Sequence, residues 1–95
     1  MKPRITISTN KDGDLEIWIN EAGRDLLVRE LQRLSEQNDH FHFGPEELDG
    51  EVPVQIQPYQ EGDRVIEWGK VLYRPDEWDA QYFPHVLGGT GRSDS

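Results

Sequence analysis

Cysteine is absent from this 95-residue chain, which excludes disulfide bridges, thiol catalysis and cysteine-based zinc sites. No apolar run approaches the length of a membrane-spanning helix, and the N-terminal MKPR is not followed by the apolar core of a signal peptide. These absences predict a soluble cytoplasmic protein that has no membrane partner.

Cations are scarce: 10 Lys and Arg stand against 19 Asp and Glu, giving a formal net charge of −9. A chain this acidic is repelled by phosphate backbones, so nucleic acid is excluded as a partner. A basic protein or a cation fits the charge better. The alternative is that the acids serve only to keep the chain in solution.

Apolar residues are also few, at 34% of the chain with a mean hydropathy of −0.84. Even so, three Trp, three Tyr and three Phe are more than a wholly disordered chain would carry. The length fits one domain. We expect that domain over residues 1–86, followed by a disordered Gly-, Ser- and Thr-rich tail at 87–95.

Residues 4–8 and 15–19 alternate between apolar and polar side chains and flank the turn sequence Asp12-Gly13, which predicts a β-hairpin. Its buried face is predicted to carry Leu15, Ile17 and Ile19, with Trp18 on the opposite face.

Asn20 then has the character of a helix N-cap. Leu27, Leu31 and Leu34 follow at helical spacing, which predicts an amphipathic helix that fades around 35–38. Gly23 within it indicates close packing on the hairpin.

Three further stretches have strand character, at residues 40–43, 51–59 and 64–74. Two prolines confine the second to a sheet edge, and Gly69 in the third indicates a bulge or a close backbone approach. The order is therefore β-β-α-β-β-β. We predict an α+β fold in which an antiparallel sheet of four to five strands packs against one amphipathic helix.

The segment DHFHF, residues 39–43, holds two of the three histidines. On a strand His40 and His42 share one face, with Cα atoms about 7 Å apart, so both imidazoles can reach one metal ion. A zinc site needs a third ligand and usually a fourth, and His85 is far away in sequence. The simpler interpretation places Phe41 and Phe43 in the core and both histidines outward. A small metal-binding domain using His40 and His42 stays as an alternative, but we predict neither a metal nor any other cofactor.

Paired carboxylates lie in turns and loops, where acids serve solvation and capping. No phosphate loop, nucleophile elbow or dinucleotide fingerprint is present, and LGGTG at 87–91 lacks the lysine and the helix that a phosphate loop requires. We therefore predict no catalytic residues and no enzymatic activity.

Both faces of the predicted sheet carry apolar side chains. We expect residues 77–86 to fold back over the second face, since large uncovered patches are rare on monomers. If they do not, Trp18, Trp68 and the two imidazoles form a face suited to a protein partner.

The hairpin, the Leu-rich helix, the DHFHF strand, the acidic loop GPEELDG and the segment VIEWGKVLYRPD follow one another in an order that resembles a known family. That family is immunity protein family thirty-two of bacterial polymorphic toxin systems. The similarity spans roughly Ile5 to Pro75, and GPEELDG stands where a Trp-Gly-Gly-like loop is expected. The resemblance implies a non-enzymatic cytoplasmic protein that binds and neutralises a cognate toxin.

The predicted partner is thus a basic toxin domain. Its predicted contacts are the acids Glu46, Glu47 and Asp49, which steer the encounter, and the anchors His40, His42 and Trp18. An orphan domain of unknown function, without a dedicated partner, is the remaining alternative. The sequence leaves the oligomeric state open.

Overall fold

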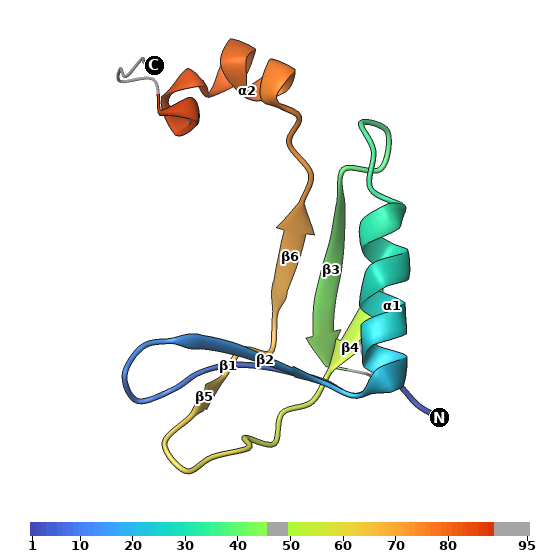
Figure 1. The fold of residues 1–95 in the computed structure, drawn as a ribbon, viewed down its shortest axis with the longest axis vertical. Helices are drawn as coiled ribbons and strands as arrows, with labels where there is room; N and C mark the ends of the chain where they lie inside the picture. The colour runs from blue at the N-terminus through green and yellow to red at the C-terminus, as the bar shows by residue number, and fades with distance from the viewer. Residues whose placement is uncertain (46–49, 89–95) are drawn as a thin grey trace.

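The structure is a computed structural model, described here for residues 1–45 and 50–88. Figure 1 shows the order of its elements. They are β1 (Ile5–Thr9), β2 (Leu15–Ile19), α1 (Glu21–Gln32), β3 (His40–Pro45), β4 (Val52–Val54), β5 (Arg64–Val65), β6 (Gly69–Leu72), α2 (Asp76–Tyr82) and the 3-10 helix η2 (Pro84–Leu87).

The described strands form two three-stranded sheets, ordered β2-β1-β5 and β4-β3-β6. In the first, β1 is central and pairs antiparallel with β2, Ile7 lying opposite Ile17. In the second, β3 is central, antiparallel to β6 and parallel to β4. The α+β class and the order of the first elements are as predicted, and β4 lies at a sheet edge as its prolines required.

The prediction of a single antiparallel sheet with one helix is wrong. The stretch 64–74, which its pattern predicts as a single strand, divides into two: β5 pairs with β1, whereas β6 pairs with β3 in the other sheet. Residues 66–68 make the crossing between sheets, and Ile66 donates its N–H to the Ile7 carbonyl on the way (2.7 Å). A second helix, α2, follows β6.

The core lies where β1, the β3–β4 pair and α1 meet. Its buried apolar side chains are Ile5, Ile7, Leu26, Phe41, Val52 and Val54. The hairpin departs from its prediction: Thr6 and Ser8 of β1 are buried along with Ile5 and Ile7, whereas Leu15, Ile17 and Ile19 of β2 are exposed. The two strands differ in burial because β1 lies between β2 and β5 in the sheet, whereas β2 is an edge strand.

The helix α1 begins at Glu21 with Asn20 as its N-cap, as the sequence predicted, and ends at Gln32, a few residues earlier than expected. The Asn20 Oδ1 accepts the N–H groups of Gly23 (2.7 Å) and Arg4 (2.9 Å), and its Nδ2 donates to the Lys2 carbonyl (3.0 Å). One side chain therefore caps the helix and ties it to the chain that enters β1.

We expect Asn20→Ala to lower the free energy of unfolding by about 1–2 kcal/mol, the upper part of the range for N-caps, because three hydrogen bonds are lost. Asn20→Asp is the matched control, since its carboxylate still accepts from Gly23 and Arg4 and loses only the bond to Lys2. Urea unfolding followed by circular dichroism measures both. Equal losses in the two variants would contradict the capping role.

The last two described elements, α2 and η2, lie apart from the two sheets. In Figure 1, α2 and η2 lie beyond the far end of β6, opposite the β1–β2 hairpin. The expected fold-back of 77–86 over a sheet face is therefore not seen. Leu87, where a disordered tail was predicted to start, closes η2, and residues 89–95 lie outside the described residues. None of the described helices combines the length and apolar content needed to cross a membrane.

Candidate functional site

The two histidines of DHFHF share the outer face of β3, as the alternation predicted. Phe41 between them is 2% exposed and belongs to the core, and Phe43 packs against it, while His40 and His42 are exposed. Their ring centroids are 4.9 Å apart and the planes nearly perpendicular, at 88°. The strand thus presents two imidazoles side by side.

Each histidine has a carboxylate beside it. The His40 Nδ1 lies 2.8 Å from Asp39 Oδ1, and this hydrogen bond holds the pKa of Asp39 below its ordinary value. The Glu51 Oε1 accepts the backbone N–H of His42 at 2.7 Å and lies 3.6 Å from its Nδ1. The backbone hydrogen bond is the main cause that lowers the pKa of Glu51. Both acids are therefore charged at neutral pH, the opposite of what a general acid requires.

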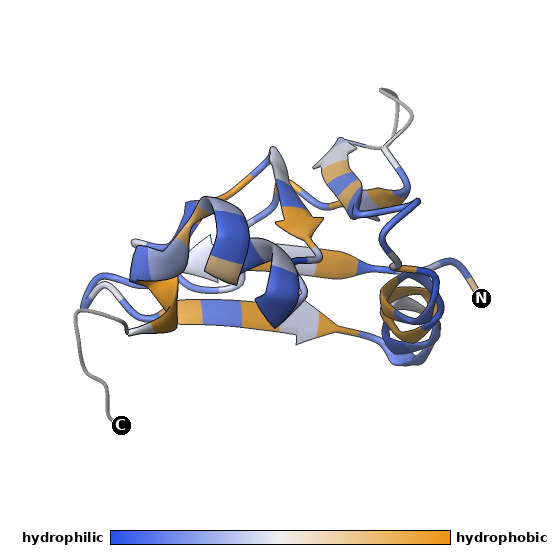
Figure 2. Ribbon diagram, turned by 90° about the horizontal axis from the view of Figure 1, so that it is seen from above, coloured by the Kyte–Doolittle hydropathy of each residue, from blue (hydrophilic) through white to orange (hydrophobic). Residues whose placement is uncertain are grey.

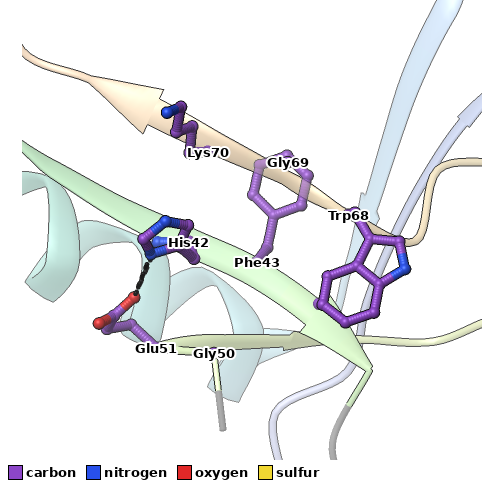
Figure 3. A pocket seen from close by; sticks show the side chains of 8 residues that line it. His42, Phe43, Gly50, Glu51, Trp68, Gly69 and Lys70 are labelled. Atoms are coloured by element: carbon purple, nitrogen blue, oxygen red, sulfur yellow. Dashed lines mark hydrogen bonds and ion pairs between the residues drawn. The ribbon is translucent and has the colours of Figure 1, made fainter. Parts of the chain in front are cut away.

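A cleft of about 440 Å³ opens beside His42, between β3, β6 and the residues that lead into β4. Figure 3 shows His42 and Glu51 on one side of it and Trp68 at the other end. Lys70, which lies directly opposite His42 across the β3–β6 ladder, also lines the cleft. The cleft therefore combines an imidazole, a carboxylate, an ammonium group and an indole.

Two glycines, Gly44 and Gly69, leave room for the rings of Trp68 and Phe43 to pack close to the strand backbone. A Cβ on Gly44 would come within 3.2 Å of the Trp68 ring, and a Cβ on Gly69 within 2.6 Å of the Cζ of Phe43. Gly69 was predicted to mark a bulge or a close backbone approach, and the structure instead places the side-chain ring of Phe43 against it. Trp68 itself is 60% exposed, so its indole is open to a partner.

The predicted contact residues are only partly brought together. His40 and His42 lie side by side, but Trp18 belongs to the other sheet, where it is half-buried and stacks on Tyr59 at a centroid distance of 4.3 Å. Glu46, Glu47 and Asp49 lie outside the described residues.

Lys70 and Glu51 line the cleft but were not among the predicted contacts. Trp68, which also lines the cleft, was predicted on a partner-binding face only for the case in which residues 77–86 do not fold back, and this is the case found in the structure. The places of Lys70 and Glu51 in the cleft follow from the β3–β6 register and the β3–β4 pairing, and the sequence alone does not give either of these.

The described residues do not complete a metal site around the histidine pair. Within residues 1–45 and 50–88, no group of three or more His, Asp or Glu side chains is placed to hold a metal ion. Each imidazole instead lies beside a single carboxylate.

We expect stability to fall at acid pH partly through Glu51. Its folded pKa is lowered, so its contribution is complete above its unfolded pKa of about 4.5 and is lost as pH falls through the folded value. Glu51→Gln keeps an oxygen for the His42 N–H but does not titrate. The urea midpoint of the wild type should therefore fall more steeply below pH 4.5 than that of the variant. Parallel pH profiles would show that Glu51 is not stabilised by folding.

Comparison of the chain with protein-family models, with curated proteins and with solved structures finds no match. The cleft and its residues therefore carry the functional argument.

Proposed function

We propose that the chain is a protein-binding domain that serves as an immunity protein, neutralising a cognate bacterial toxin by direct contact in the cytoplasm of the producing cell. The observation that carries this proposal is the open cleft beside β3, where the exposed rings of His42 and Trp68 flank charged groups of both signs. Tryptophan is among the residues most enriched at the energetic centres of protein interfaces.

The role is non-enzymatic. The two perturbed carboxyl groups, Asp39 and Glu51, have pKa values lowered rather than raised, so neither is set up as a proton donor at neutral pH. A binding role needs only what the cleft offers: an indole for burial, and Lys70 and Glu51 to fix the orientation of a partner side chain.

Charge supports a basic partner. At a net charge of −9, the chain attracts a cationic surface such as the substrate cleft of a nuclease toxin, and this attraction speeds association. Glu46, Glu47 and Asp49 add three of those negative charges between Pro45 and Gly50, and Gly50 lines the cleft. Their attraction is long-ranged and does not require fixed side-chain positions.

The test uses the protein encoded beside this chain in its genome. Co-expression should restore growth that this neighbour inhibits, and calorimetry should show binding that weakens as salt is raised from about 0.05 M to about 0.5 M. Trp68→Ala should weaken binding at least about 30-fold, the value of an interface hot spot. Ile56→Ala, an exposed apolar residue outside the cleft, is the matched control and should change affinity by less than about threefold.

Full protection by the Trp68→Ala variant would place the binding surface elsewhere. A neighbour that neither inhibits growth nor binds the chain would overturn the immunity function itself. An affinity that does not change with salt would overturn only the steering by acids.

A further inference from the structure

Glycine backbone forms the stretch of the cleft between Trp68 and Glu51. A Cβ on Gly50 would lie 3.3 Å from the Gly44 nitrogen and 3.4 Å from the His42 carbonyl oxygen, so these two parts of the chain pack together with no side chain between them. Glu51 follows Gly50 directly, and the Trp68 ring approaches Gly44. The two glycines therefore leave open space between the indole at one end of the cleft and the carboxylate at the other (Figure 3).

Trp68 offers an open aromatic face at its end of the cleft. Its ring meets Gly44 along one edge, where Cε3 and Cζ3 would each lie 3.2 Å from a Cβ, and the residue is 60% exposed. The face of an aromatic ring carries partial negative charge, so it attracts a cation and not an anion. Tryptophan attracts cations more strongly than the other aromatic residues, and the cation found over such rings is more often arginine than lysine.

Glu51 supplies a held negative charge at the other end. Its Oε1 accepts the His42 backbone N–H at 2.7 Å, and its Oε2 accepts no hydrogen bond from the other described residues. The side chain is 47% exposed, and the bond from the His42 N–H keeps the pKa of Glu51 below its ordinary value, so the group is charged at neutral pH. A carboxylate with a free oxygen forms strong, charge-assisted hydrogen bonds with a guanidinium.

Lys70, which lies opposite His42 on β6, opposes a cation in the cleft. Its side chain is exposed and has a long flexible stem, and its ammonium group is not held by any of the described residues. The ammonium group can therefore turn away from the cleft, toward water or toward an acidic group of a partner. Glu51 has less freedom, because the backbone of β3 holds its carboxylate.

The charge of the whole chain favours a cation as well. Hydrophilic residues lie in helices and strands alike (Figure 2), and the charged ones comprise 19 Asp and Glu against 10 Lys and Arg. A net charge of −9 attracts cationic partners from a distance. Such a partner is itself rich in Lys and Arg, and arginine is among the side chains most enriched at the energetic centres of interfaces.

We propose that the cleft receives an arginine side chain of the protein partner, with the guanidinium against the Trp68 ring and its N–H groups donating to Glu51. This inference rests on the proposed function, because it names the group through which the partner is recognised. Arginine fits better than lysine because the planar guanidinium stacks on an indole and presents several N–H donors in a fixed arrangement, whereas an ammonium group is a strongly hydrated point charge. Lys70 is then left for a different, acidic group of the same partner.

A short peptide tests the cleft independently of the partner. The probe is the tripeptide Gly-Arg-Gly, acetylated and amidated so that arginine carries its only charge, titrated into the isotope-labelled full chain at neutral pH. The readout is the NMR signal of the Trp68 indole N–H, assigned by its loss in Trp68→Phe. We expect a saturable shift with a dissociation constant of about 1–10 mM. The lysine version should bind at least about fivefold more weakly, and the glutamate version should give no shift.

Three variants separate the groups of the cleft. Glu51→Gln, which still accepts the His42 N–H, should weaken binding of the arginine peptide at least about fivefold. Glu36→Gln removes the same charge at an exposed position outside the cleft and is the matched control, with a change of less than about twofold. Lys70→Met should leave the affinity unchanged or raise it by up to about threefold, because it removes an opposing charge.

The absence of a saturable shift up to about 50 mM arginine peptide would overturn the inference, and toxin binding by the same chain would then leave the proposed function standing. Peptide binding without any binding of the protein encoded beside the chain would have the opposite meaning: the immunity function fails and the affinity for guanidinium stands. Equal binding of the lysine peptide, or equal losses in Glu51→Gln and Glu36→Gln, would show that overall charge alone attracts the probe and would overturn the site. Binding of the glutamate peptide that Lys70→Met weakens would overturn it in favour of a carboxylate.

Discussion

Phe41→Ala should lower the free energy of unfolding by about 3–5 kcal/mol, the range found when a buried phenylalanine is truncated. The ring is 2% exposed and lies in the cluster that joins the second sheet to β1, so its removal opens a cavity in a small core. The total free energy of unfolding of a domain of this size is about 5–15 kcal/mol. The melting temperature should therefore fall by more than about 12 °C.

His40→Ala, one residue away on the exposed face of β3, is the matched control and should change stability by no more than about 0.5 kcal/mol. Phe41→Leu keeps most of the volume and should cost less than about 1.5 kcal/mol. Urea unfolding of the three variants decides the matter. A large loss in His40→Ala would contradict the assignment of the histidines to a binding face.

The alternation of DHFHF was enough to predict which side chains of β3 are buried, because a strand with one covered face must alternate. The same reasoning failed for β2. Its alternation is as regular, but a periodic pattern predicts only which side chains share a face and does not predict whether another element reaches that face. Leu15, Ile17 and Ile19 share the core side of their sheet and remain exposed because β2 is at the edge.

The split of residues 64–74 between two sheets could not be predicted from local propensity. Val65 and Val71 both have strand character, but their partners, Ser8 and Phe41, lie far away in the chain. The cleft depends on this split. Lys70 faces His42 only because β6 pairs with β3, and Trp68 reaches Gly44 only because the chain crosses between the sheets just before Gly69.

Gly23→Ala should lower the free energy of unfolding by about 2–3 kcal/mol, although helix propensity alone predicts a gain of about 1 kcal/mol. A Cβ at this buried position would lie 2.7 Å from the Arg4 carbonyl oxygen and 2.9 Å from Ile5 Cγ1. The carbonyl belongs to the backbone and accepts the Asn20 N–H at 3.1 Å, so it cannot move without disturbing the helix cap. The hairpin and α1 would have to separate.

Gly44→Ala is the matched control for this prediction, because the one tight contact of its new Cβ would be with the exposed indole of Trp68 at 3.2 Å, which can shift, while the Glu67 carbonyl oxygen at 3.7 Å is at an ordinary contact distance. We expect a change of no more than about 1 kcal/mol there. The sign of the Gly23→Ala effect, measured by urea unfolding, is the decisive result. A more stable variant would mean that α1 and β1 do not approach each other as closely as the structure places them.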